Sequence, residues 1–358
     1  MKRSASSTAR TRSAGAVGVL CLLVAVALNA VLVHQRGLSG DEPYYERIAS
    51  HPAGPHNFPY AFRIGLPYLV HVLPFSHAFS WELLALIVAA AAGGALWSLL
   101  TELGTEPPLA ACLSVGFTIS PPLLVVLLRN GRGVDALAIL VITLGCLFIV
   151  RRQRLALVLT LLVGTTVHES CLFLIPLAYA VWAQRPVDRA ALRDLALVAA
   201  LPALVYLYLR SAIVAVGEGY QPGYGPSFVH ERIALIRDAL RGGGWKLELR
   251  RLALSFGALW LVAPVALWRP GFPRRGLALV SPCALSMTFA LDWGRAIFFA
   301  APVFYAAAAS VLSGRRRLAL AVVVMLLAVD LGYAGYMQLH GVRYGLDSTA
   351  PPARGPVH

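Results

Sequence analysis

The sequence predicts an all-α protein, a polytopic bundle of transmembrane helices. Of its 358 residues, 58% are hydrophobic and only 13% are charged, whereas soluble domains carry roughly 25% charged residues. Apolar runs of about 17–25 residues recur along the chain, and each is long enough to cross about 30 Å of hydrocarbon. The runs are unbroken and do not alternate as barrel strands do, so internal backbone hydrogen bonding within lipid requires them to be helices.

About eleven spans are expected from these runs. The basic residues before the first run resemble the start of a signal peptide, but the run is too long for a cleaved leader, so we expect an uncleaved anchor. A shorter apolar stretch, 64–79, contains two prolines and is expected to be re-entrant or interfacial. The expected helices cover residues 14–33, 81–100, 108–128, 134–150, 155–167, 171–183, 195–215, 252–268, 276–291, 296–312 and 317–337.

Short arginine clusters between the apolar runs determine the expected orientation. Clusters at 151–154 and 185–193 flank the run 155–183. If both are cytoplasmic, as the positive-inside rule requires, the run crosses twice and turns at His168-Glu169-Ser170. One long tilted helix remains the alternative. The paired interpretation puts the N-terminus in the cytoplasm and the C-terminus outside a cell inner (plasma) membrane.

This orientation divides the chain into three parts. Residues 1–13 form a basic cytoplasmic N-terminus, and residues 338–358 form an extracytoplasmic tail. Residues 14–337 form a single transmembrane domain with long outer loops at about 34–63 and 217–251.

Two other classes of protein are excluded by the placement of charge and cysteine. The net charge of +14 would suggest nucleic-acid binding in a soluble protein, but here membrane topology explains the basic clusters. We therefore expect no nucleic-acid partner. The five cysteines are scattered through apolar segments without metal-motif spacing, so they indicate neither a disulfide framework nor a zinc site.

The first outer loop contains the strongest candidates for chemistry. Asp41 and Glu42 are adjacent carboxylates that could supply a general base or ligands for a divalent cation, although acids in a solvated loop are common. Arg63 lies where the chain enters an apolar segment. Its guanidinium could bind a phosphate at the membrane surface or extend to lipid headgroups.

Two further outer turns contain charged residues. Arg129, Arg132 and Asp135 lie in one glycine-containing turn that suits anion binding, while Asp135 could instead cap the helix that follows. His168 and Glu169 are costly beside a membrane segment, so a polar role is expected for them. The structural alternative is a pair between Glu169 and an arginine of another outer loop.

Two last groups complete the candidates. Asp292 and Arg295 could pair across a turn, or Asp292 could orient Arg295 toward a phosphate. Tyr220 and Tyr224 lie in the longest outer loop, where tyrosines stack on sugars or form an interfacial belt.

A first helix followed at once by a long outer loop that opens with Asp41-Glu42 resembles the C-type (GT-C) glycosyltransferase superfamily. The paired short helices that meet at His168-Glu169 are compatible with its membrane module. The resemblance implies a polyprenyl-phosphate-linked sugar as donor and a saccharide or protein as acceptor. It makes Asp41 or Glu42 the base or a metal-linked residue. It makes Arg63, Arg132 or Arg295 the groups that hold the lipid phosphate.

The leading hypothesis is therefore a membrane glycosyltransferase. A transporter or flippase for lipid-linked saccharides, a polymerase-like polysaccharide assembly protein and a non-catalytic scaffold are the alternatives. No cofactor is assigned; whether a divalent cation takes part stays open at this stage.

Overall fold

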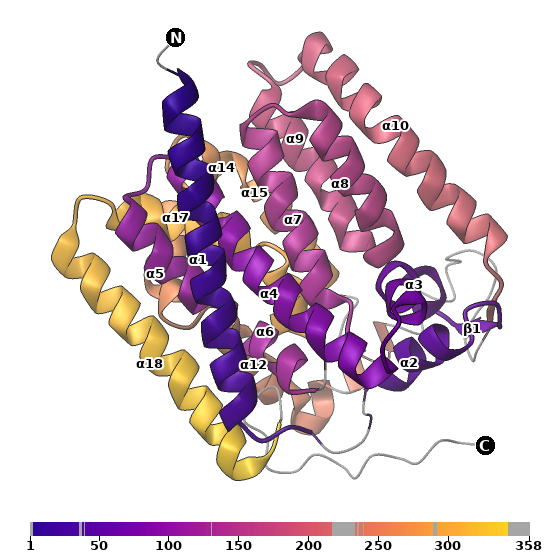
Figure 1. The fold of residues 1–358 in the computed structure, drawn as a ribbon. Coiled ribbons are helices and arrows are strands. Elements are labelled where there is room, and N and C mark those ends of the chain that lie inside the picture. The colour runs from indigo at the N-terminus through magenta and orange to yellow at the C-terminus, as the bar shows by residue number, and fades with distance from the viewer. Residues whose placement is uncertain are drawn as a thin grey trace.

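The computed structural model describes residues 3–35, 38, 40–129, 131–216, 233–234, 236–238, 240–288 and 292–342. In these residues the chain is almost entirely helical (Figure 1). The helices are α1 (Arg3–Val31), α2 (Glu42–Ser50), η1 (Tyr60–Phe62), α3 (Gly65–Val72), α4 (His77–Glu102), α5 (Pro107–Thr118), α6 (Pro121–Leu128), α7 (Asp135–Val150), α8 (Arg154–Val167), η2 (Glu169–Phe173), α9 (Leu174–Trp182), α10 (Arg189–Ala212), η3 (Leu240–Gly244), α12 (Trp245–Phe256), η4 (Gly257–Leu261), α13 (Ala263–Ala266), α14 (Phe272–Arg275), α15 (Leu277–Ser286), α16 (Trp293–Phe298), α17 (Ala301–Leu312) and α18 (Arg316–His340).

Two short strands accompany the helices. Strand β1 (His56–Asn57) pairs in parallel with β2 (Ala215–Val216). This pairing attaches the first loop to the chain just after α10, so the loop is fixed at two distant points of the sequence.

The all-α prediction is confirmed, and the apolar helices identify a membrane protein. Within the described residues, four helices are long and apolar enough to cross a membrane, namely 13–31 of α1, α4, α10 and α18. The expected span 108–128 is a bent pair, α5 and α6, with an angle of 47° between them. Counting this pair as one span gives up to five. The prediction of about eleven spans, and of which terminus faces the cytoplasm, is left untested.

Prolines and glycines explain where the expected helices are broken. The expected helix 252–268 is divided into α12, η4 and α13 at Gly257, whose φ is +46°. The expected helix 296–312 is divided into α16 and α17 just before Pro302. A proline nitrogen has no hydrogen to donate, so each proline is tolerated best at the start of a new helix. Residues 65–72 form only the short helix α3.

The run 155–183 folds back on itself. Helix α8 ends at Val167, and His168 has extended backbone with φ −161° and ψ 136°. The thiol of Cys171 lies 4.0 Å from the carbonyl oxygen of Ala138, near the start of α7. The indole of Trp182 donates to the carbonyl of Ile149 at 3.0 Å, near the end of α7. Residues 169–182 therefore run alongside α7, and the chain turns at His168-Glu169-Ser170.

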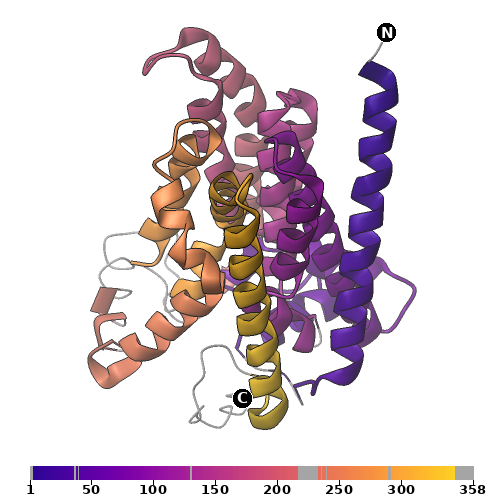
Figure 2. The ribbon, with the colours of Figure 1, turned by 90° about the vertical axis from the view of Figure 1, so that its left-hand side faces the viewer.

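The two ends of the bundle carry different charged residues. We call the end that holds Asp135 and His168 the site end, and α2, α3 and β1 gather there, away from the N-terminus of α1 (Figure 1). Helix α7 has 16 residues, so it extends about 24 Å from Asp135 to the opposite end. There Arg151 pairs with Glu102 and Arg154 with Asp194. We call this the basic end. Helix α1 lies along one edge of the bundle (Figure 2).

One continuous apolar core extends through the bundle. It includes Tyr45 of α2, Trp81 of α4, Phe117 of α5 and Phe298 of α16, all almost completely buried. The rings of Phe117 and Phe298 stack with centroids 5.7 Å apart. This core holds α2 and α16, which contribute to the charged cluster described below, in a fixed relation to the bundle.

Gly131 provides a test of how tightly the site end is packed. Its φ is +68°, and an added Cβ would overlap the carbonyl oxygen of Trp81. We expect Gly131→Ala to lower the free energy of unfolding by about 2 kcal/mol or more, from backbone strain and overpacking together. Gly104→Ala is the matched control, because φ is +90° there and no neighbour lies within 4 Å. Equal losses in detergent unfolding would contradict close packing at Gly131.

Candidate functional site

Three aspartates meet at one guanidinium at the site end. The Nη1 atom of Arg295 donates to Oδ2 of Asp41 at 2.8 Å and to Oδ2 of Asp135 at 3.3 Å. The Nε atom of Arg295 lies 3.6 Å from Oδ2 of Asp292. The first loop, the start of α7 and the start of α16 therefore converge, although they are up to 254 positions apart in sequence. We call these four residues the Arg295 cluster.

Local structure places each member of the cluster. Asp41 directly precedes α2. Asp135 occupies the first turn of α7, where a carboxylate is favoured by the helix dipole. Asp292 caps α16, and its Oδ1 accepts from the backbone nitrogen of Arg295 at 3.0 Å. The Asp292–Arg295 pair considered from the sequence therefore agrees with the geometry. Capping by Asp135 does not, because α7 has no side-chain cap hydrogen bond and Asp135 is already its first helical residue.

Asp41 is an ionised and partly exposed carboxylate of the cluster. Its Oδ1 accepts a hydrogen bond of 2.6 Å from the Tyr60 hydroxyl, and its side chain is 25% exposed. Burial raises the pKa of Asp41, but the Arg295 charge and the hydrogen bonds from Tyr60 and Arg295 outweigh it and hold the pKa below its usual value. Asp41 therefore carries a negative charge at neutral pH.

A second ion pair lies beside the cluster. Arg63 donates two hydrogen bonds to Glu169, one from Nη2 at 2.6 Å and one from Nε at 3.2 Å. Its Nη1 donates to the Tyr45 hydroxyl at 3.1 Å. Burial would raise the pKa of Glu169, but the charge of Arg63 reverses the effect and holds that pKa well below its usual range. The structure therefore gives Glu169 the partner from another loop that the structural alternative predicted.

His168 is neutral in this arrangement. Burial and then the nearby Arg63 charge lower its pKa to about 4. Its Nδ1 accepts from the backbone nitrogen of Ser170 at 3.1 Å, so the proton of the neutral ring is on Nε2. The ring also packs against Phe299, with centroids 4.7 Å apart. The 3.9 Å approach of His168 to Glu169 is therefore not an ion pair at neutral pH.

The other two acids of the first loop, Glu42 and Glu46, have partners of their own. Glu42 is buried, with Arg129 4.0 Å from its Oε1. Arg132 donates to Glu46 at 2.9 Å, and Glu46 also accepts from the indole of Trp81. The adjacent acids Asp41 and Glu42 thus differ in exposure and in partner. Asp41 is partly exposed and pairs with Arg295, whereas Glu42 is buried.

The sequence did not single out Tyr45, Tyr60 or Glu46 as site residues. The available signal for Tyr45 and Glu46 was their spacing from Asp41 and Glu42, which puts them one helical turn further along α2. No local signal pointed to the Tyr60 hydroxyl, because its contact with Asp41 depends on the fold of the loop. Tyr220 and Tyr224 lie outside the described residues.

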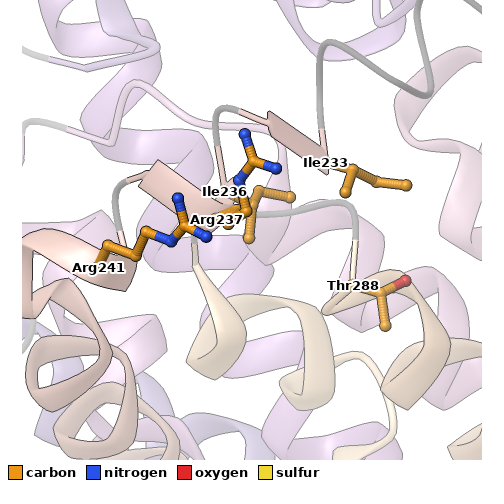
Figure 3. A pocket seen from close by; sticks show the side chains of 5 residues that line it. All are labelled: Ile233, Ile236, Arg237, Arg241 and Thr288. Carbon is orange, nitrogen blue, oxygen red and sulfur yellow. The ribbon is translucent and has the colours of Figure 1, made fainter.

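A pocket of about 460 Å³ is lined by Ile233, Ile236, Arg237, Arg241 and Thr288 (Figure 3). Arg237 and Arg241 line it together with apolar side chains, and both guanidiniums are visible at its edge. Thr288, on another wall, is four residues before Asp292, so their Cα atoms are at most about 14 Å apart. This pocket combines positive charge with an apolar lining.

The donor set does not fit a bound divalent cation. Among the described residues, no group of three or more His, Cys, Asp and Glu side chains could hold a metal ion. Asp41 and Asp135 do converge as cation ligands would, but the Arg295 guanidinium already lies between their oxygens. No step of the chemistry below is therefore assigned to a metal.

Comparison with known proteins assigns the fold. No protein-family profile and no curated protein matches the chain. Two solved structures of the Archaeoglobus fulgidus oligosaccharyltransferase are similar to it, at 15% sequence identity each. The complex with Zn and sulfate aligns with a TM-score of 0.58 over 92% of this chain and 53% of that one. The form tethered to an acceptor peptide containing the NVT sequon gives 0.55, over 95% and 56%.

These likenesses show the fold alone: the helical bundle of this chain is similar to part of the oligosaccharyltransferase. The chain spans about half the length of the enzyme it matches. This finding agrees with the expected resemblance at the level of the fold alone.

The pair of Arg63 and Glu169 makes a stability prediction. Arg63 is buried while the Glu169 side chain is 36% exposed. We expect Glu169→Gln to cost about 1–2 kcal/mol of unfolding free energy, because a buried guanidinium loses its counter-charge. Asp238→Asn is the control, since the Arg237–Asp238 pair is exposed and contributes less than about 1 kcal/mol. Thermal unfolding in detergent measures both, and a Glu169→Gln loss no larger than the control would contradict the pair.

Proposed function

We propose that this protein is a membrane glycosyltransferase that moves a sugar from a polyprenyl-phosphate donor to a saccharide or protein acceptor of the cell envelope. The reaction takes place on the extracytoplasmic face of the inner membrane. The observation that carries the proposal is an ionised, accessible Asp41 at the convergence of the first loop, α7 and α16 in a C-type fold.

Asp41 is assigned the general base. The acceptor hydroxyl attacks the anomeric carbon as the bond from that carbon to the phosphate oxygen breaks, and Asp41 takes the hydroxyl proton. The lipid phosphate leaves as an anion and needs no proton. Arg295 and Tyr60 orient Asp41, because each donates to a different oxygen of its carboxylate.

The lipid phosphate is assigned to the pocket of Arg237 and Arg241. The other candidate phosphate holders are less suited, since Arg63, Arg132 and Arg295 each pair with a carboxylate side chain that is 36% exposed or less. Arg237 also pairs with an acid, Asp238, but that pair is exposed and contributes less than about 1 kcal/mol. Arg237 and Arg241 lie four residues apart beside an apolar surface, which suits a charged headgroup attached to a hydrocarbon chain. The short chain distance between Thr288, which lines this pocket, and Asp292 of the Arg295 cluster supports the assignment.

Separate substitutions of the two adjacent acids test the base. Asp41→Asn is expected to reduce kcat about 10²–10⁴-fold, because the proton acceptor is removed. Glu42→Gln leaves that acceptor in place, so it should act mainly through stability. Transfer of radiolabelled sugar in membranes, normalised to protein level, is the measurement. Equal effects of the two substitutions would contradict the assignment.

The pH dependence of transfer provides a second check on Asp41. The pKa of Asp41 is held below the ordinary value for aspartate. The base is therefore deprotonated throughout the neutral range, and protonation of Asp41 should cause no loss of kcat between pH 5 and 7. Tyr60→Phe removes a hydrogen bond that lowers this pKa, so any acid-side fall of kcat should move to higher pH in that variant. A fall of kcat between pH 5 and 7 in the unaltered protein that is absent from the residual activity of Asp41→Asn would show a raised pKa instead.

The donor pocket is tested by neutralising its charges. Arg237→Ala and Arg241→Ala should each raise the KM for the lipid donor about tenfold, the loss expected for one charge-assisted hydrogen bond. The effect on kcat should be smaller. Arg185→Ala, an exposed arginine after α9 at the basic end, is the matched control with unchanged KM. Donor KM values that do not respond to either pocket substitution would place the phosphate elsewhere.

A further inference from the structure

The contacts of Arg295 resemble those of a bound cation. A single nitrogen, Nη1, lies between oxygens of two carboxylates that belong to different parts of the chain, Asp41 at 2.8 Å and Asp135 at 3.3 Å. The carboxylate of Asp292 faces the same guanidinium from a third side. Carboxylate oxygens that converge on one point are also the ligands that a divalent cation binds.

The geometry points to Arg295 as the built-in cation of this site, occupying the position of a divalent ion between Asp41 and Asp135. The chain then needs no bound metal to hold these carboxylates together. The inference deepens the proposed function and rests on it for its catalytic meaning, since it gives the proposed base a permanent cationic partner. The charge arrangement itself can be tested without any transfer reaction.

Asp41 and Asp135 share a single ion-pair partner within the described residues. In the part of the chain that the structure describes, Arg295 is the only basic residue paired with Asp41 or Asp135. The neighbouring Arg63 is occupied by Glu169 and Tyr45. The guanidinium is attached to α16 and always protonated, so it cannot dissociate as a metal ion does.

The distances explain why the guanidinium and a metal exclude each other. Calcium binds carboxylate oxygens at about 2.3–2.6 Å, and the two oxygens already lie 2.8 and 3.3 Å from Nη1. Only a small contraction would close them around an ion at this point. Oδ1 of Asp135 is buried and accepts no hydrogen bond, so it would also become a free ligand. With the guanidinium present, its charge and volume prevent both changes.

This arrangement predicts a gain of metal binding when Arg295 is removed. The full chain is purified in detergent and titrated with Mn²⁺, and free Mn²⁺ is followed by electron paramagnetic resonance. The unaltered protein should bind no stoichiometric Mn²⁺ up to about 1 mM, the weak end of carboxylate sites. Arg295→Ala should bind about one ion per chain, at least about tenfold more tightly than the unaltered protein, because three carboxylates lose their counter-charge.

Three variants serve as controls. Arg295→Lys keeps the positive charge and should not gain Mn²⁺ binding. Arg295→Gln keeps a hydrogen-bond donor without the charge, so it should gain binding even if the alanine variant folds poorly. Adding Asp135→Asn to either charge-removing variant should abolish the gain, because Asp135 supplies the bridging oxygen.

Two results would overturn the inference. One is stoichiometric Mn²⁺ binding by the unaltered protein that is lost in Asp135→Asn, which would mean that Arg295 gives way to a metal. The other is a folded Arg295→Gln variant with no gain in binding. A chain that behaves as expected toward Mn²⁺ but transfers no sugar would instead contradict the proposed function and leave the cation assignment intact.

Discussion

The contact of Arg295 with Asp41, Asp135 and Asp292 connects parts of the chain that nothing in the local sequence brings together. Without a cation, carboxylates this close would repel one another. The guanidinium removes that penalty and fixes Asp41 in a single orientation. The first loop is thereby held to the ends of two helices, α7 and α16, of the bundle.

The surrounding arginines have carboxylate partners of their own. Glu169 engages Arg63, and Glu46 engages Arg132, so neither arginine is available to Asp41. Tyr60 links Asp41 to the start of α2. Its hydroxyl donates to Asp41, and its ring stacks on Tyr44 with centroids 4.5 Å apart. The carboxylate of Asp41 is consequently ionised and partly exposed to solvent. The proposed base for an acceptor hydroxyl needs both properties.

Periodicity and charge placement predicted much of the architecture. The long apolar run of α4 was expected at 81–100 and is found at His77–Glu102. The turn at His168-Glu169-Ser170 followed from arginines on both sides of one apolar run. These features are local, or depend on a membrane constraint that every span shares. The bend between α5 and α6 and the division of 252–268 depend on individual proline and glycine positions, which hydropathy averages over a window.

The sequence also indicated which charged residues belong to the site, but not how they pair. Arg63, Arg132 and Arg295 were interchangeable candidates for binding phosphate, since each lies in an outer loop beside an acid. Which acid each one meets is decided by tertiary packing across as many as 254 positions. The distinction between Asp41 and Glu42 has the same origin, because adjacent residues at a helix start point in different directions, one toward Arg295 and the other into the protein.

A double-mutant cycle between Asp41 and Arg295 tests the central contact most directly. Unfolding free energies are measured for Asp41→Asn, Arg295→Gln and the double variant in the same detergent. Direct contact predicts a coupling energy of about 1 kcal/mol or more, with the double variant less destabilised than the sum of the single ones. Effects that add within about 0.5 kcal/mol would mean that the two side chains do not touch, and the cluster described above would not exist.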